Sequence, residues 1–258
     1  MLQYNGQFYF ILTSDIILKI SCFDISKKLI HQIKKRFSFF IKSKYDSKNF
    51  FELEIYKSYK SLKDKKFVKF LRKDVKLFYD DKKFYGVISE NIFSFDTLLR
   101  VVTSLVVLEN GGIILHSSNV LEGKKSVLYT GPTNSGKTTI AKKYKKNKIL
   151  TDELSILFFE NNKVVSVRSP FWGDLKSAFY KDSIEKKFVV DRIMFLFGFV
   201  KDNKPKIKIL SFKESVILLL KNLFWVLKDE SYNEKILKIV FKIAKTIPCY
   251  KFYSVYEI

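Results

Sequence analysis

Apolar and polar residues alternate in short runs over the first 95 positions, which is typical of β-strands with one buried face. These runs are QFYFIL, DIILKISCF, FFELEIY and VKLFYDDKKFYGVI. One segment between them, SKKLIHQIKKRF, has the spacing of a helix instead. We therefore expect residues 1–95 to form a small N-terminal α+β subdomain. His31 lies on the expected helix, where a solvated or packed histidine is more common than a metal ligand.

The pattern changes after residue 95. FDTLLRVVTSLVVLEN has helical periodicity and ends at Gly111-Gly112, a suitable helix stop. An apolar strand, GIILHSSNVL, and a second one, SVLYT, follow on either side of a turn at EGKK. Further on, ILTDELSILFFENNKVVSVRSP predicts a short strand, an acidic pair and a hairpin that turns at Asn161-Asn162.

Two late helices are predicted by Ser-x-x-Glu capping boxes, SFKE at 211–214 and SYNE at 231–234. The second helix should end before Pro248, and an alternating strand, YKFYSVYEI, closes the chain. The apolar faces of both helices are more typical of core than of a membrane or partner surface. Strands and helices in this order predict an α/β (α+β) protein with a second domain over residues 96–258.

Composition narrows the choice of partners. The net charge is +22, but only five of the 48 basic residues are arginine. Because nucleic-acid readers rely on arginine forks, a nucleic-acid partner is unlikely, and a diffuse basic surface is the simpler interpretation. No stretch of 18 uncharged apolar residues and no basic signal-peptide start occur, so we expect a protein without membrane segments. Cys22 and Cys249 form no metal spacing or disulfide framework, which fits a reducing cytoplasm.

One motif carries specific chemistry. LYTGPTNSGKTT contains the spacing G-x-x-x-x-G-K-[ST] of a phosphate-binding loop, after an apolar strand and before a helical pattern that runs through TTIAKKYKK. In such a loop, backbone N–H groups and the helix N-terminus hold phosphate oxygens, the lysine reaches the β- and γ-phosphates, and the hydroxyl binds Mg²⁺. A glycine-rich turn without a ligand is the alternative. The expected ATP-binding residues are Gly131, Pro132, Thr133, Asn134, Ser135, Gly136, Lys137, Thr138 and Thr139.

Three further features are candidates for the same site. Asp152 and Glu153 follow Lys137 closely and end a strand, so they could bind the metal or accept a proton from an attacking hydroxyl. A solvated turn acid is the alternative. His116 lies inside an apolar strand, where a hydrogen-bonded core histidine is more common than a catalytic one. The segment PFWGD, 170–174, is interpreted as a hydrophobic corner in preference to a lid over a base or substrate.

Taken in order, LHSS, GPTNSGKTT, LTDELSI and PFWGD resemble the catalytic domain of HPr kinase/phosphorylase and its smaller relatives. The resemblance covers residues from about 95 to the end and implies a phosphoenolpyruvate-carboxykinase-like P-loop domain with a mixed β-sheet. It also implies ATP- and Mg²⁺-dependent phosphorylation of a serine hydroxyl on a protein or peptide. The implied catalytic residues are Asp152, His116 and Lys137, and the implied metal ligands are Thr138, Asp152 and Glu153.

The chain departs from that family at several positions. Glu153 stands where the family has a second Asp, and Ser117 follows the histidine where HPr kinases have Gly. RSPFWGDL replaces the Glu-Ile-Arg-Gly signature of the bifunctional enzyme, so the closer resemblance is to the small HPr-kinase-related proteins.

These observations leave three candidate functions to be tested. The first is an ATP-dependent serine/threonine kinase acting on a protein or peptide. The second is a non-catalytic ATP-binding module that recognises a partner peptide, and the third is an NTPase acting on nucleic acid. The sequence is compatible with a homo-oligomer in each case.

Overall fold

A computed structural model of the protein describes residues 4–45, 50–58, 67–68, 73–80, 83–175, 185–200, 204–225 and 230–255. These residues form two mixed β-sheets and five α-helices, which confirms the α+β class. The chain divides into two compact units: unit 1 is Met1–Val106 with Trp225–Asp229, and unit 2 is Val107–Phe224 with Glu230–Ile258. The boundary expected from the sequence, 95/96, falls inside a helix, α2 (Ile92–Glu109).

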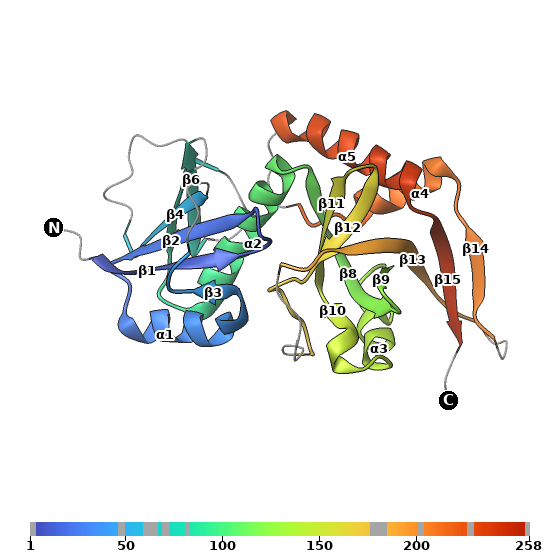
Figure 1. Ribbon diagram of the computed structural model, residues 1–258, viewed down its shortest axis with the longest axis horizontal. Coiled ribbons are helices and arrows are strands. Elements are labelled where there is room, and N and C mark those ends of the chain that lie inside the picture. Colours follow the sequence, from blue (N-terminus) through green and yellow to red (C-terminus); the bar gives the residue numbers. More distant parts are fainter. Residues whose placement is uncertain are drawn as a thin grey trace. The chain divides into compact units, whose positions relative to one another are not determined.

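Unit 1 contains a seven-stranded sheet in the order β3-β1-β2-β4-β7-β6-β5 (Figure 1). Its strands are β1 (Tyr4–Ile11), β2 (Ile17–Phe23), β3 (Ile41–Lys42), β4 (Phe51–Tyr56), β5 (Phe67–Val68), β6 (Val75–Asp80) and β7 (Lys83–Ile88). The β2–β4 and β4–β7 pairs are parallel, and the other pairs are antiparallel. The expected strands of the N-terminal segment are therefore present.

The helix predicted around His31 is α1 (Lys27–Arg36). The Ser26 side chain caps its N-terminus by accepting the Leu29 N–H, and the helix ends in three basic residues, which suits its C-terminal dipole. Leu29, Ile30 and Ile33 are buried while His31 is exposed. His31 is thus a solvated histidine, as expected.

Unit 2 contains the second sheet. Its strands are β8 (Gly112–Glu122), β9 (Lys125–Thr130), β10 (Ile149–Thr151), β11 (Leu154–Glu160), β12 (Lys163–Val167), β13 (Phe188–Val200), β14 (Lys206–Ile209) and β15 (Cys249–Val255). Its helices are α3 (Lys137–Lys142), α4 (Phe212–Lys221) and α5 (Asn233–Thr246), with short 3₁₀ turns η1 (Ser38–Phe40), η2 (Lys146–Lys148) and η3 (Glu230–Tyr232) elsewhere in the chain. Helix α3 packs against β8 and β9, and α5 packs against β8, β11 and β12 (Figure 1).

Two long strands connect the second sheet into a ring. Strand β8 pairs with both β9 and β11, and β13 pairs with both β9 and β12. Because β11 also pairs with β12, hydrogen bonds run through β8, β11, β12, β13 and β9 and return to β8. Both edges of β9, the strand that leads into the glycine-containing loop, are therefore occupied.

Of the three turn and cap predictions, two are confirmed. The hairpin between β11 and β12 turns at Asn161 and Asn162, both with positive φ, as two-residue hairpin loops require. The capping box of α4 is present, with Ser211 and Glu214 each bonding to the other's backbone N–H. The box predicted at 231–234 is wrong, because Tyr232 is the N-cap residue of α5 and provides no side-chain cap.

Strand β13 has no counterpart in the sequence-based prediction, although it is the longest strand among the described residues. Its sequence, FVVDRIMFLFGFV, is a nearly continuous apolar run rather than an alternating one. Strand β13 has parallel neighbours on both edges, β9 and β15. Strands of this kind are typically covered on both faces of the sheet, so their sequences do not alternate between apolar and polar residues.

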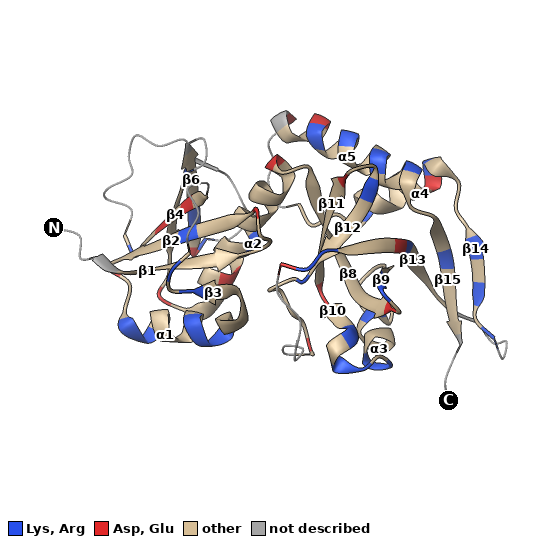
Figure 2. Cartoon of the chain, in the orientation of Figure 1, with Lys and Arg blue, Asp and Glu red and all other residues tan. Residues whose placement is uncertain are grey.

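Basic residues are spread over many elements. Figure 2 shows Lys and Arg on α1, α3, α5, β14 and β15 rather than along one element. Within the part of the chain that the structure describes, no helix is long and apolar enough to cross a membrane.

Candidate functional site

Strand β9 carries the chain into the loop 131–136, hereafter the glycine loop. At its last residue, Thr130, β9 pairs with Ser117 of β8 on one edge and with Phe195 of β13 on the other. The Thr130 hydroxyl also donates to the backbone oxygen of His116 at 2.9 Å. The loop therefore starts from a fixed point in the sheet, and α3 begins directly after it at Lys137.

The backbone conformation of the glycine loop requires Gly or Asn at particular positions. Asn134 and Gly136 adopt positive φ values of 63° and 92°, which Gly and Asn tolerate best. At Gly131 a Cβ atom would lie 2.9 Å from the Ser135 hydroxyl and 3.1 Å from the Leu196 carbonyl oxygen. Gly131 is thus required for close packing of the loop against β13.

Lys137 points back into the loop. Its Nζ donates to the carbonyl oxygens of Gly131 at 2.8 Å and Pro132 at 2.7 Å, and the residue is only 7 % exposed. Burial lowers the pKa of this amine below its ordinary value of 10.5. A desolvated cation held at the mouth of a loop is suited to pair with an anion.

A polar network fixes the strands beneath the loop. Glu122 at the end of β8 accepts hydrogen bonds from Tyr144, beyond α3, at 2.6 Å and from Tyr129 of β9 at 3.3 Å, and it pairs with Arg192 of β13. Burial alone would raise the pKa of Glu122, but the hydrogen bonds from Tyr144 and Arg192 hold it below its ordinary value. The network joins β8, β9, β13 and the end of α3.

The helix after the loop is shorter than predicted. Helix α3 ends at Lys142, because Lys143 and Tyr144 bond three residues back, to Ile140 and Ala141. These i→i−3 bonds tighten the last turn and stop the helix. Tyr144 then turns towards Glu122, as described above.

The acidic pair lies one strand further across the sheet. The Ser117 N–H donates to the Glu153 carbonyl oxygen at 2.9 Å, and the Ser118 hydroxyl contacts the Asp152 carbonyl oxygen at 3.4 Å. Since Ser117 also pairs with Thr130, the backbone of the pair is two strand spacings, about 10 Å, from the start of the loop. That separation can be bridged by a triphosphate and a metal ion.

The Asp152 side chain is buried and already hydrogen-bonded. It is 3 % exposed, and its two oxygens accept the backbone N–H groups of Gly173 at 2.9 Å and Leu175 at 3.0 Å. The interpretation of Asp152 as a solvated turn acid is therefore wrong. Glu153, the next residue, is half-buried.

The segment PFWGD wraps around Asp152. Phe171 is fully buried, and its carbonyl oxygen accepts the Thr151 hydroxyl at 2.7 Å. Trp172 packs on the core cluster that contains Tyr129 and Ala141. These contacts are those of a hydrophobic corner, in line with the preferred interpretation. The same corner holds the Asp152 carboxylate in place through Gly173.

His116 is exposed, although its immediate neighbours in β8 are buried. The interpretation of His116 as a core histidine is therefore wrong. Its backbone N–H donates to the Asn222 carbonyl oxygen at 2.8 Å, and it is paired with Leu154, directly after the acidic pair. The sheet thus brings the start of the glycine loop, His116 and the acidic pair onto adjacent strands.

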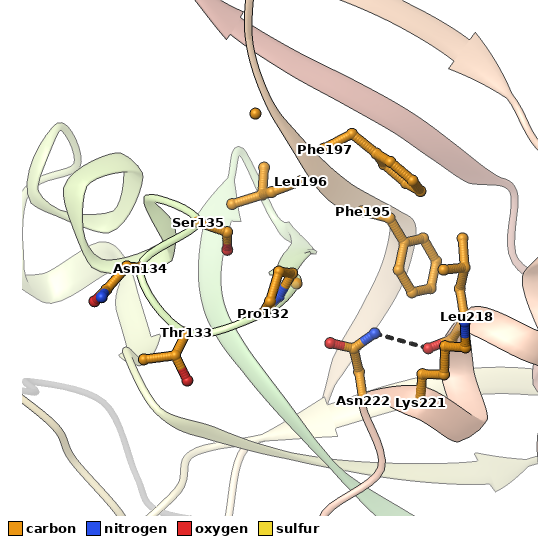
Figure 3. A pocket seen from close by; sticks show the side chains of 12 residues that line it. Pro132, Thr133, Asn134, Ser135, Phe195, Leu196, Phe197, Leu218, Lys221 and Asn222 are labelled. Carbon is orange, nitrogen blue, oxygen red and sulfur yellow. Dashed lines mark hydrogen bonds between the residues drawn. The ribbon is translucent and has the colours of Figure 1, made fainter.

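A cavity of about 520 Å³ adjoins the glycine loop. Residues 131–135 form one wall, the end of β13 from Phe195 to Gly198 forms a second, and Leu218, Lys221 and Asn222 at the end of α4 form a third. Figure 3 shows Phe195 and Leu218 facing Pro132 across this space. The sequence-based prediction places none of these β13 and α4 residues at the site, because residues 188–200 were not assigned to an element and the helix after the Ser211–Glu214 box was assigned to the core. The apolar run interrupted by Gly198 was the available signal.

Two features of the site bear on whether it could hold a magnesium-bound nucleoside triphosphate. Besides Lys137, the loop holds a buried Ser135 hydroxyl that has no hydrogen-bond partner among the described residues. Those residues also include no group of three His, Cys, Asp or Glu side chains that could hold a metal. Mg²⁺ commonly takes only one or two carboxylates and completes its shell with phosphates and water. Thr138 and the acidic pair are the residues of the site whose oxygen atoms are of the type that Mg²⁺ takes.

Comparisons with known proteins add no assignment: no protein-family model matches the chain, and a search of curated proteins finds no match.

Proposed function

We propose that the protein is an ATP-dependent kinase that phosphorylates a serine or threonine hydroxyl of a protein or peptide. One observation carries the proposal. Hydrogen bonds of Ser117 place its neighbour His116, the start of the glycine loop and the acidic pair side by side on β8, β9 and the β10–β11 bend. Phosphoryl transfer needs a phosphate cradle, a metal-binding carboxylate and a group that orients the acceptor hydroxyl.

The glycine loop would hold ATP through its backbone N–H groups, Lys137 and the Thr138 hydroxyl. ATP supplies the transferable γ-phosphoryl group, and Mg²⁺ neutralises charge on the phosphates. Lys137 leaves the carbonyl oxygens of Gly131 and Pro132 and pairs with phosphate oxygens instead. The loop residues assigned to the nucleotide remain 131–139, as expected from the motif.

We assign the acceptor hydroxyl to the part of the site formed by His116 and the acidic pair. His116 is exposed and adjoins Leu154 across the sheet, so its imidazole can hydrogen-bond an incoming hydroxyl and orient it. Glu153 and Asp152 would contribute carboxylate oxygens to Mg²⁺, and Asp152 positions the bend through Gly173 and Leu175. This chemistry is in line with the resemblance to HPr-kinase-related proteins and a phosphoenolpyruvate-carboxykinase-like fold, and with a cytoplasmic location.

Transfer of label from γ-labelled ATP to a library of Ser/Thr peptides tests the proposal. The two histidines of the chain offer a matched pair, because His116 and His31 are both exposed. We expect His116→Ala to lower the transfer rate by about 100-fold or more, because the loss of a general acid–base group costs at least about that much. His31→Ala should leave the rate unchanged, and Lys137→Ala should abolish ATP binding. Equal rates for the two histidine variants would refute the assigned role.

One observation favours a second function. Both Asp152 oxygens are hydrogen-bonded to backbone N–H groups of the corner, which is also what a purely structural carboxylate would show. A non-catalytic ATP-binding module that recognises a partner peptide would keep Lys137-dependent ATP binding but transfer no label. Detection of transfer above a Lys137→Ala background eliminates this second function.

A further inference from the structure

Of the cavity walls described above, only the glycine loop takes part in the chemistry proposed above. None of Lys137, Thr138, His116, Asp152 and Glu153 lines the cavity. Its volume, about 520 Å³, is within the roughly 300–1,000 Å³ range of small-molecule sites. It opens where β9 ends, between the glycine loop and β13, and the carboxyl ends of strands are common ligand positions in α/β sheets.

The walls of the cavity adjoin two different strands, because Phe195 and Phe197 belong to β13 whereas the Asn222 carbonyl oxygen accepts the His116 N–H of β8. The acidic bend follows β8 on one side of β9, whereas Phe195 and Phe197 belong to β13 on the other side. A triphosphate whose terminal group faces the acidic pair can place its other end against the β13 wall of the cavity, on the far side of β9. That other end carries the nucleoside.

The walls of the cavity suit a flat apolar group. Pro132, Phe195, Phe197 and Leu218 provide aromatic and aliphatic surface. Of the polar lining, the Asn222 amide nitrogen donates to the Leu218 carbonyl oxygen at 2.8 Å (Figure 3). Lys221, on the same wall, adds positive charge that suits a phosphate near the ribose.

We propose that this cavity binds the nucleoside of the triphosphate held by the glycine loop. The proposal rests on the function proposed above and adds the residues that recognise the base. Packing against aromatic and aliphatic side chains is tolerant of base identity, since every base has a π-face. GTP should accordingly bind within about tenfold of ATP, and both should bind more tightly than inorganic tripolyphosphate.

Calorimetric titration of magnesium ATP and of magnesium tripolyphosphate into the full chain distinguishes the contribution of the nucleoside to the binding affinity from that of the phosphates. Phe197 and Phe241 form a matched pair, because they are 44 % and 43 % exposed and each contacts one other aromatic ring. Phe197→Ala removes one wall of the cavity, and Leu218→Trp fills it. Phe241→Ala, on α5, changes a comparable surface away from the cavity.

We expect Phe197→Ala and Leu218→Trp to weaken ATP binding by roughly 5- to 150-fold, the range of base–aromatic stacking, and to leave tripolyphosphate binding unchanged. Phe241→Ala should change neither. If wild type binds ATP no more tightly than tripolyphosphate, or if Phe197→Ala leaves ATP affinity intact, the nucleoside site is refuted while the loop assignment stands. Failure of wild type to bind either ligand overturns the proposed function and this inference together.

Discussion

Lys137 combines two properties that conflict in the free protein. Its amine is nearly enclosed, and burial lowers its pKa below 10.5, yet the charge is what a phosphate-binding lysine must supply. A bound polyphosphate favours the protonated amine and raises the pKa again. Ligand binding and protonation of Lys137 are therefore coupled.

That coupling predicts the pH dependence of nucleotide binding. Below the lowered pKa of free Lys137 the amine is already charged, so binding takes up no proton. Above it, binding must protonate the amine, and affinity should fall as the pH rises towards 10.5. Calorimetry in two buffers of different ionisation enthalpy measures the proton uptake, which Lys137→Arg should remove because the guanidinium is always charged. Uptake of the same size in that variant would contradict the assignment.

Asp152 offers a test at the neighbouring strand. In Asp152→Asn an NH₂ group replaces one of the oxygens that accept the Gly173 and Leu175 N–H groups, so one N–H loses its acceptor and the new NH₂ group is enclosed beside it. We expect a loss of about 2 kcal/mol in the free energy of unfolding, measured by urea denaturation. Asp174→Asn, an exposed neighbour, is the control and should have no measurable effect. Equal midpoints for the two variants would show that the corner does not depend on Asp152.

At the scale of elements, β8 is closely packed where it begins after α2. A Cβ atom on Gly112 would lie 2.4 Å from the Leu157 carbonyl oxygen, 2.6 Å from a Phe158 ring carbon and 2.8 Å from a Val107 methyl. Gly112→Ala should therefore destabilise the protein by about 1–3 kcal/mol or more, through overpacking between β8 and β11. Thermal unfolding monitored by circular dichroism measures the loss.

Gly123 provides the control for that substitution. It has a positive φ of 63°, but no atom lies within 4 Å of the position of an added Cβ. Gly123→Ala therefore adds only the left-handed backbone cost, about 1 kcal/mol. If both variants unfold at the same temperature, the close contact of Gly112 with β11 is not a determinant of stability.

Elements with local signals were predictable from the sequence, and elements defined by distant neighbours were not. The Asn161-Asn162 turn and the Ser211–Glu214 box depend on residues within four positions of each other. By contrast, β13 is recognised only by its pairing with β9, β12 and β15. The exposure of His116 likewise depends on what covers β8, which no local pattern of hydrophobicity encodes.

The same limit applies to the candidate site. The glycine loop and the acidic pair follow from a motif and a strand end, so their residue numbers could be given in advance. The hydrogen bonds that hold Asp152 come from Gly173 and Leu175, which lie outside the motif. The cavity walls come from β13 and α4, which meet the loop only in the folded chain.

At the scale of the whole molecule, the chain has two compact units, and the glycine loop, the acidic pair and the cavity all belong to unit 2. A ligand stabilises the structure to which it binds, by about 2.7 kcal/mol at a hundredfold excess over its Kd. We expect magnesium ATP to slow hydrogen exchange at residues 131–138 and in β8, β9 and β13. Exchange in the strands of unit 1 should change much less, and mass spectrometry of peptic fragments measures both. Protection confined to unit 1 would contradict the placement of the site.

The pairing of β9 with β13 has a consequence for how the protein acquires its shape. Thr130 and Phe195 become neighbours only after the intervening hairpin and corner have been made, and such distant pairings form slowly because closure of a long chain segment precedes any gain. A nascent chain that has been synthesised only as far as the glycine loop therefore lacks β13 and cannot yet form the complete phosphate-binding site. Recovery of ATP binding during refolding should therefore lag behind recovery of the β8–β9 hairpin. It reports when β13 pairs with β9.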